Sequence, residues 1–475
     1  MPFVVASIAL AAQVATAQVA EQRSTLADQR EVAVTIYNDN LALVKDQRRV
    51  QLKTGAGALA FRDVSARMRP ETAQLRSVSA PGALSVVEQN FDFDLLTPQK
   101  MLEKYVGQTV NVVRTNPATG AESTEVATVL SANNGVVLQI GQRIETGIPG
   151  RLVFGSVPAN LRDRPTLVMA LENTTATAQD VELSYLTGGL AWKADYVVEL
   201  NAADDRLDML GWVTLTNTSG ASYRNARVQL VAGDVNQVAP EVAQRGRVLM
   251  AAPAMAKAVS EVAQESLFEY HLYTLGRPTT IAENQTKQVA LLSARGVPAR
   301  KELLLRGNDY YYQSSVGDLG QKLKVAVFVE FENKESARLG LPLPKGVIRV
   351  YKKDSAGNAQ FIGEDRIDHT PKGEKVRLKL GDAFDVTADK KQTDFKKLGG
   401  TGKYNAVYES AFEFVLKNAK KEAVVVTVQE PMPGDWQILS ASQPHTKGAS
   451  NTATWNVAVP AEGQTTLTYR ALVRY

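Results

Sequence analysis

The stretch SYLTGGLAWKADY, residues 184–196, decides how the chain is interpreted. From Leu190 to Leu200 apolar and polar residues alternate, which is the period-two pattern of a half-buried strand. A second set of apolar residues, alternating with polar ones, precedes it over Val181–Tyr185. Two adjacent glycines supply the positive φ angles that a two-residue turn needs. The stretch therefore predicts a β-hairpin that turns at Gly188-Gly189.

The register of this hairpin predicts which side chains are buried. Tyr185 faces Trp192, and every partner of an apolar residue falls on the same face of the ribbon. A slip of one residue would destroy that agreement. Trp192 is therefore predicted to be a core residue, and Lys193 and Asp195 are predicted to be neighbours on the polar face. A binding site on this polar face is the alternative to a purely structural corner.

Composition limits the classes of function that the chain can have. The 475 residues suffice for several domains, and a hydrophobic fraction of 44% is that of a globular protein. The net charge is +4 without any block of Lys or Arg, so we expect no nucleic-acid partner. The absence of cysteine excludes disulfides, thiol catalysis and zinc–thiolate sites.

The N-terminus indicates export. MPFVVASIALAAQVATAQ is apolar, and Ala15-Thr16-Ala17 is a small-x-small site before Gln18, so residues 1–17 are predicted to be a signal peptide. The segment lacks a basic n-region, and the alternative is an N-terminal cytoplasmic tail. No other segment approaches the ~20 apolar residues of a membrane-spanning helix, so no transmembrane span is expected.

Strand patterns and turns predict a mainly β chain. We expect multidomain antiparallel β-sandwiches of immunoglobulin-like type, with a small N-terminal β-barrel and one helical or disordered insertion. After the signal peptide, the expected parts are an N-terminal β segment at 18–93, a small β-barrel-like domain at 94–160, a β-sandwich at 161–320 and a C-terminal β-sandwich at 321–475. An Ala/Met-rich stretch at 239–266 is the predicted insertion in the first sandwich.

Two local signals mark the predicted barrel-like domain. Thr97 is a predicted N-cap, Pro98 occupies the first helical position, and Met101, Leu102 and Tyr105 give the short helix its apolar face. Further along, Asn133-Asn134-Gly135 predicts a tight hairpin turn.

The densest polar cluster lies in GEDRIDHTPKGE, residues 363–374. Its acidic and imidazole side chains are Glu364, Asp365, Asp368 and His369. Carboxylates this close together are suited to a calcium ion, although the spacing is not that of an EF-hand loop. The alternative is a charged strand end and turn that neighbouring basic side chains neutralise.

Aromatic residues near predicted turns form a second group of candidates. They are Tyr310, Tyr311, Tyr312 and Trp436. Exposed aromatics at the edge of a sandwich can stack on sugars or join a protein interface. Ordinary packing at the base of loops is the alternative.

The sequence carries no catalytic motif. Its three histidines stand in separate segments, and no nucleophile elbow, zinc-binding helix or phosphate-binding loop is present. Paired carboxylates of a hydrolase remain an alternative, because three isolated acids lie next to turns. These acids are Asp195, Asp234 and Asp435. We expect no catalytic residue, no cofactor and no metal.

Long strings of sequence carry a family resemblance. YLTGGLAWKADYVVEL, GWVTLTNTSGASYRNARVQLVAGDV, FIGEDRIDHTPKGE and EPMPGDWQIL together resemble the DUF4139 family of exported bacterial proteins. The likeness covers roughly 165–475, and the segment from Tyr37 to Leu161 is similar to the N-terminal part usual in such proteins. Related chains are described as mucoidy-inhibitor-like. The resemblance supports an exported, β-rich protein and brings no catalytic residues.

The sequence thus predicts a non-enzymatic protein of the Gram-negative cell envelope, either periplasmic or secreted to the cell surface. It would act through protein–protein binding or structural assembly, with a partner protein or with itself. The alternatives are an envelope glycan-binding protein, whose partner would be a polysaccharide, and a hydrolase that uses paired carboxylates.

Overall fold

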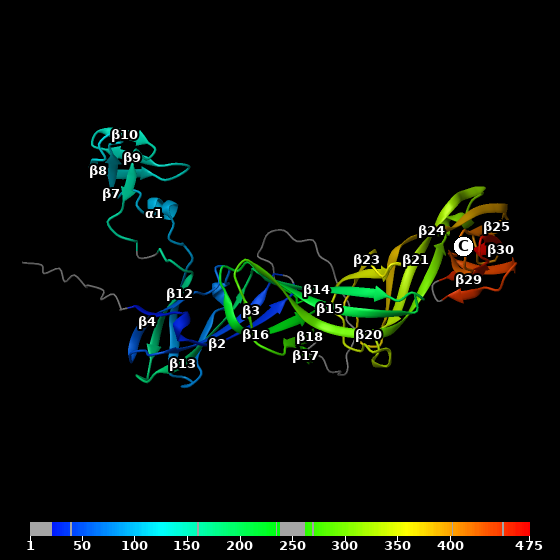
Figure 1. Ribbon diagram of the computed structural model, residues 1–475, viewed down its shortest axis with the longest axis horizontal. Helices are drawn as coiled ribbons and strands as arrows, with labels where there is room; N and C mark the ends of the chain where they lie inside the picture. Colours follow the sequence, from blue (N-terminus) through cyan, green and yellow to red (C-terminus); the bar gives the residue numbers. More distant parts are fainter. Residues whose placement is uncertain are drawn as a thin grey trace, which may run out of the picture. The chain divides into compact units, whose positions relative to one another are not determined.

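The computed structural model shows a mainly β protein (Figure 1). It describes residues 21–38, 40–158, 161–233, 235–237, 262–267, 270–400, 402–448 and 451–475. The predicted signal peptide and most of the predicted 239–266 insertion lie outside these residues. The chain forms two compact units, each assembled from three segments. The first comprises 1–191, 215–230 and 277–287, and the second comprises 192–214, 231–276 and 288–475.

Two sheets form a sandwich in the first unit. One sheet has the order β1-β4-β12-β6, and the other contains β16-β2-β3-β13-β5, with β19 beside β16. The bounds are β1 (Glu21–Ser24), β2 (Gln29–Tyr37), β3 (Ala42–Val50), β4 (Gly55–Arg62), β5 (Gln74–Ser77), β6 (Leu84–Asp92), β12 (Thr166–Asn173), β13 (Gln179–Thr187), β16 (Tyr223–Ala232) and β19 (Thr279–Ile281). Strands β1 and β4 run parallel, whereas the pairs β4–β12, β12–β6, β2–β3, β3–β13, β13–β5 and β16–β19 are antiparallel.

A buried arginine connects the two sheets of this sandwich. Arg48 of β3 is fully buried and lies over the ring of Phe61 in β4, 3.8 Å from its centroid. Its guanidinium contacts the carboxylate of Asp46 at 2.7 Å and donates to the backbone carbonyls of Ser24 and Arg62. One side chain thereby joins β1, β3 and β4.

The five-stranded domain follows the N-terminal strands. It contains α1 (Pro98–Lys104), β7 (Thr109–Thr115), β8 (Glu122–Ser131), β9 (Val137–Ile140), β10 (Arg143–Thr146) and β11 (Arg151–Val153). The predicted cap is confirmed, because the Thr97 hydroxyl accepts from the Lys100 N–H at 3.1 Å. The Asn133-Asn134-Gly135 turn is also confirmed, since it joins the antiparallel strands β8 and β9.

The expected small β-barrel is an open sheet instead. Its order is β10-β9-β8-β7-β11, and no pairing between β10 and β11 is present in the described part of the domain. A barrel requires its first and last strands to pair. Here the two edge strands are only four and three residues long. Helix α1 covers one face of the sheet, where Met101, Leu102 and Tyr105 join a core that includes Val112 and Leu138.

The second unit is built on a long, continuous set of strands. Its main path is β23-β22-β14-β15-β20-β21-β24-β25-β30-β27. The bounds are β14 (Leu190–Leu200), β15 (Arg206–Asn217), β20 (Gln285–Arg306), β21 (Asp318–Glu332), β22 (Gly346–Lys353), β23 (Ala359–Ile367), β24 (Lys375–Lys397), β25 (Val407–Asn418), β27 (Asp435–Ala441) and β30 (Gly463–Arg474). The pair β17 (Val262–Leu267) and β18 (Tyr270–Leu275) is antiparallel.

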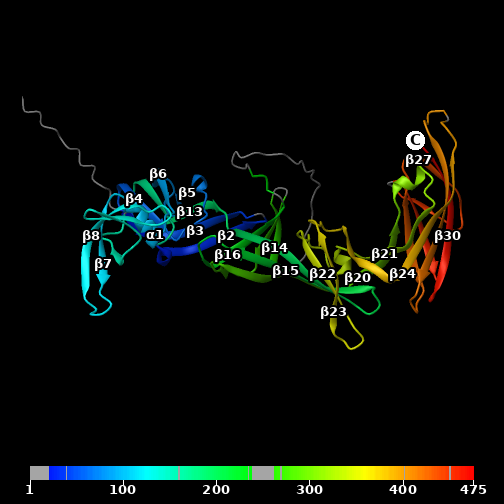
Figure 2. The same ribbon diagram turned by 90° about the horizontal axis from the view of Figure 1, so that it is seen from above.

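The C-terminal part of the second unit is a sandwich (Figure 2). One layer contains β24, β25, β30 and β27, and the other contains β26 (Val424–Pro431), β28 (Thr446–Gly448) and β29 (Thr452–Val459). Strand β26 also pairs in parallel with β20. The core between the layers includes Phe412, Phe414, Trp455 and Leu467, each at most 1% exposed.

The hairpin predicted at Gly188-Gly189 does not form. Both strands and their buried faces are as expected, and Trp192 is 4% exposed. However, β13 pairs with β3 and β5, whereas β14 pairs in parallel with β22. The Gly189 N–H donates to the Asn40 side chain, and its carbonyl accepts from Thr218. The glycine pair therefore passes the chain from one sheet to another.

The linear domain boundaries also differ from the structure. Strand β12 lies in the predicted 161–320 sandwich but pairs with β4 and β6 of the N-terminal segment. Residues 262–266, which the prediction placed in the insertion, belong to strand β17 instead. Boundaries inferred from local sequence patterns cannot show which strands from distant segments pair with one another.

Within the described residues, no helix is both long enough and apolar enough to cross a membrane.

Candidate functional site

The predicted calcium cluster does not converge. Glu364 pairs with Arg349 at 3.2 Å, while the Asp365 carboxylate accepts the backbone N–H groups of Arg366 and Lys379. His369 Nδ1 accepts from the backbone of Lys345. Among the described residues no three His, Asp or Glu side chains gather in a way that could hold a metal ion.

For Asp368 only a backbone contact is defined, in which its carbonyl accepts from the Thr370 hydroxyl. The sequence alternative of a charged strand end and turn therefore describes the four residues better than a calcium site. Successive side chains of a strand point to opposite faces, which separates neighbouring acids such as Glu364 and Asp365.

The predicted stacking aromatics are mostly core residues. Tyr311 is 7% exposed, Tyr312 is fully buried and Trp436 is 5% exposed. Only Tyr310 reaches solvent, at 57% exposure, and its ring packs edge-on against Tyr311 at 4.5 Å. Three of the four aromatics are thus closed to a sugar, and packing at the base of the loops describes them.

The isolated acids are paired with cations or hydroxyls. Asp195 accepts from Thr214 at 2.8 Å and from Arg349 at 3.1 Å, and Lys193 lies 3.6 Å away, as the predicted neighbour on that face. Burial raises the pKa of Asp195, but these hydrogen bonds and charges outweigh it, so its pKa lies below the ordinary 3.8. A general acid needs the opposite shift.

Asp435 contacts the Tyr404 hydroxyl and lies 3.7 Å from Arg474. The hydrogen bond from Tyr404 lowers the pKa of Asp435, against the opposing effect of burial. Asp234 lies outside the described residues. Neither described acid has the properties of a carboxylic acid held protonated for catalysis.

The acid side of the stability profile tests the Asp195 site. Because its folded pKa lies below the unfolded value, its stabilisation is fully present above the unfolded pKa and is lost as pH falls through the folded pKa. Below about pH 4 we expect the free energy of unfolding of Asp195→Asn to fall less steeply with decreasing pH than that of the wild type. Urea unfolding at a series of pH values measures it, and identical acid limbs in both proteins would contradict the assignment.

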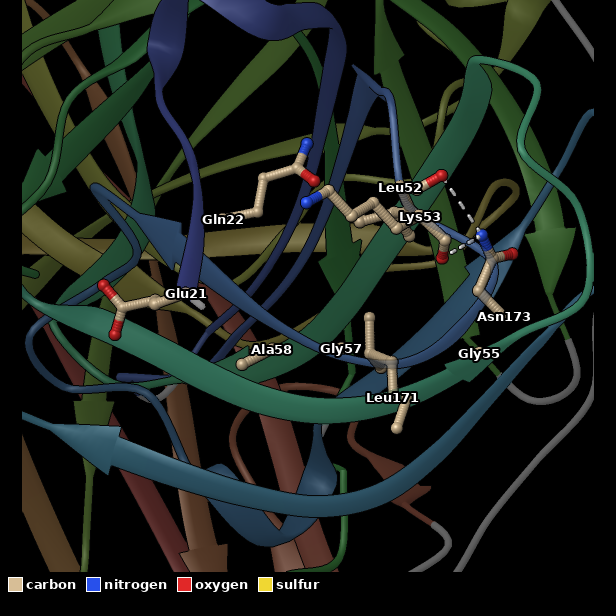
Figure 3. Close-up of a pocket in the computed structure, with 10 residues that line it drawn as sticks. Glu21, Gln22, Leu52, Lys53, Gly55, Gly57, Ala58, Leu171 and Asn173 are labelled. Atoms are coloured by element: carbon tan, nitrogen blue, oxygen red, sulfur yellow. Dashed lines mark hydrogen bonds between the residues drawn. The ribbon is translucent and has the colours of Figure 1, made fainter. Parts of the chain in front are cut away.

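A cavity of about 470 Å³ lies beside β1, β4 and β12 (Figure 3). Its walls are largely small residues and backbone, with Gly55, Gly57 and Ala58 along β4. Asn173 donates to the carbonyl of Lys53 at 3.0 Å. The carboxylate of Glu21 is held by Arg162 at 2.7 Å, a hydrogen bond that lowers the pKa of Glu21. The cavity therefore presents no pair of acids suited to hydrolysis.

The open face of the five-stranded sheet is uncharged at its centre. Strand register sets two rows of neighbouring side chains across it: Val153, Asn111 and Val126 in one row, and Thr109, Thr128, Gln139 and Ile144 in the other. Ile144 and Val126 are 67% and 63% exposed. An ion pair between Arg151 and Glu122 stands at one end of the face. We call these two rows the uncharged face.

The remaining charges of the domain are gathered elsewhere. Arg114 contacts Glu125 and Glu145, and Arg143 contacts Glu125 at 3.1 Å. Arg114 and Glu125 alternate with the residues of the uncharged face along β7 and β8 and so point to the opposite side. In a chain with 22% charged residues, two exposed β-branched side chains with uncharged neighbours form a surface suited to contact with another protein.

A buried polar network lies in the C-terminal sandwich. Lys390 of β24 and Glu430 of β26 are 1% and 0% exposed at the side chain, and Nζ lies 2.7 Å from Oε2. The hydroxyls of Tyr312 and Tyr469 lie 2.9 and 3.0 Å from the same oxygen. The network joins the two layers of the sandwich.

Sequence reasoning missed this network. In β24, Lys390 occupies the next inward-facing position after Val386 and Ala388. In β26, Glu430 occupies the next inward-facing position after Val426 and Val428. A charged residue on the apolar parity of a strand was the available signal.

Comparison with known proteins agrees with the resemblance seen in the sequence. The model of the domain of unknown function DUF4139 matches residues 181–475, more than half of the chain. No curated protein matches the sequence significantly. The chain belongs to the DUF4139 family.

Proposed function

We propose that this protein is an exported, non-enzymatic component of the Gram-negative cell envelope that acts through protein–protein contacts. The N-terminal sequence supports export, because an apolar segment ends in the small-x-small site Ala15-Thr16-Ala17. The single observation that carries the contact role is the uncharged face, with Val126 exposed on the middle strand β8 and Ile144 exposed on the edge strand β10.

The chemistry of this face favours a protein partner. Threonine, asparagine and glutamine offer hydrogen bonds, while Val126, Ile144 and Val153 offer apolar area without a charge to desolvate. A polysaccharide is usually bound through exposed aromatic rings, and none of the seven residues of the uncharged face is aromatic. A nucleic acid would require a basic surface.

Site-specific photocrosslinking tests the face directly. A photoreactive residue in place of Val126 is expected to give one protein adduct in cells, because this side chain would lie within the interface. Adding Ile144→Lys should lower the adduct about tenfold, since an unpaired ammonium would be desolvated on binding. Val425, which is 56% exposed on β26, is the matched control position and should give no adduct.

Light scattering of the purified protein at several concentrations identifies the kind of partner. A discrete oligomer that Ile144→Lys dissociates would mean that a second copy binds the face. A monomer that still gives the Val126 adduct in cells would mean a different protein. A monomer without that adduct would contradict the proposed contact role.

A further inference from the structure

The Lys390–Glu430 pair is unusual because it is completely enclosed. Lys390 Nζ lies 3.9 Å from the ring centroid of Tyr311, 4.8 Å from that of Phe414 and 5.1 Å from that of Phe412. Burial lowers the pKa of Lys390, against the opposing effect of Glu430. An ammonium and a carboxylate in such surroundings carry a large desolvation penalty.

The two carboxyl oxygens of Glu430 have very different surroundings. Oε2 is approached by Lys390, Tyr312 and Tyr469. Oε1 is buried without a hydrogen-bond partner in the described part of the chain. It packs against the backbone of Gly307, where a Cβ atom would lie only 2.1 Å from it. The site therefore supplies donors for one oxygen and not for two.

The number of donors and acceptors fits an amide better than an ion pair. An ammonium has three N–H groups, and within the described residues Lys390 makes one hydrogen bond, to Glu430. A carboxylate with one bare oxygen leaves a buried acceptor unsatisfied. A secondary amide has a single N–H and a single oxygen, and the two tyrosine hydroxyls suffice for that oxygen.

We propose that Lys390 and Glu430 condense into an intramolecular amide that crosslinks the two layers of the C-terminal sandwich. The bond that forms joins Nζ of Lys390 to Cδ of Glu430. The bond that breaks joins Cδ to Oε1, and Oε1 leaves as water. No oxidant, reductant or activating reagent is consumed.

Proton transfer within the pair precedes attack. The ammonium gives one proton to the carboxylate, which yields a neutral amine and a neutral carboxylic acid that carries this proton on Oε1. The amine lone pair then attacks Cδ, and negative charge develops on Oε2. A proton from nitrogen passes to the departing Oε1, so that water and a neutral amide are the products.

The tyrosines have the geometry of an oxyanion site. The hydroxyls of Tyr312 and Tyr469 lie within 3.0 Å of the atom on which negative charge develops. Donors placed in advance around a developing oxyanion lower the barrier of acyl transfer. The exclusion of water by the surrounding rings also opposes hydrolysis of the product.

The intact mass of the full purified protein tests the proposal. The chain is expected to be lighter, by one water molecule, than its sequence mass, corrected for any removed leader. A tryptic digest should contain a branched peptide that joins the segments around Lys390 and Glu430. The exposed pair Lys353–Glu199, also 2.7 Å apart, is the control in the same digest and should remain unlinked.

Variants separate the chemistry from the fold. Lys390→Met should restore the full sequence mass. Tyr312→Phe with Tyr469→Phe should slow the appearance of the lighter form about a hundredfold, as expected on removal of oxyanion donors. Wild-type protein of full mass with no branched peptide would overturn the proposal, whether or not any variant folds, and would leave Lys390–Glu430 as an ion pair.

Discussion

Replacing Arg48 by alanine is expected to lower the free energy of unfolding by about 4 kcal/mol, because it removes one partner of a buried ion pair. Asp46, itself 5% exposed, would remain in the core of the first unit, where Gln29 is the one other described side chain that donates to it, at 2.9 Å. The carbonyls of Ser24 and Arg62 would each lose the donor that Arg48 supplies. We therefore expect β1, β3 and β4 to loosen together.

Hydrogen exchange of peptides from these three strands measures the effect. Arg49→Ala is the matched control, because Arg49 follows directly in β3 but pairs with Asp180 at the surface, with 46% of its side chain exposed. An exposed pair of this kind is worth at most about 1 kcal/mol. Equal losses at the two positions would show that Arg48 does not hold the sheets together.

The second large effect is expected at Gly189, where alanine should cost about 3 kcal/mol. Its φ angle is +82°, which disfavours any residue with a Cβ atom. A Cβ atom there would lie 2.6 Å from Cα of Ser219 and 2.7 Å from its nitrogen. Because both are backbone atoms, the clash is relieved only by moving the chain.

Gly82→Ala separates the two causes. Gly82 has a nearly identical φ of +80°, but nothing lies within 4 Å of a Cβ built on it. Its substitution should cost only the conformational strain, about 1 kcal/mol. Thermal or urea unfolding followed by circular dichroism compares the two variants. If both lost the same stability, the close approach to Ser219 would have no energetic weight.

These predictions bear on how the protein works. The proposed contact role would require rigid surfaces, and both Arg48 and Gly189 hold strands from distant segments together in the first unit. The uncharged face belongs to the same unit but to its five-stranded domain, which has a core of its own. Variants such as Ile144→Lys can therefore be expected to change binding while the domain core stays intact.

The local features of the chain could be predicted because they depend on residues a few positions apart. Alternation identified the buried faces of β13 and β14, and Thr97 and the Asn133-Asn134-Gly135 turn marked the ends of their elements. The mainly β class follows from the same kind of pattern, whereas the DUF4139 membership rests on the family model that matches residues 181–475.

Partners across the sheets were decided only in the tertiary structure. Gly188-Gly189 is equally compatible with a hairpin and with a crossing between sheets, and the contacts of Gly189 with Asn40 and Thr218 select the crossing. Such contacts join residues far apart in the chain, and the alternation of apolar and polar residues within one strand does not predict them.

The same reason explains why the buried charges were missed. Arg48 shares the buried face of its strand with Val44 and Val50, and Lys390 shares that of its strand with Val386 and Ala388. The sequence alone does not show what lies opposite these faces. Asp46 shares the strand of Arg48, but Glu430 reaches Lys390 only because two layers pack face to face. A charged side chain can be buried where the fold places an opposite charge beside it, and only the tertiary packing determines where that happens.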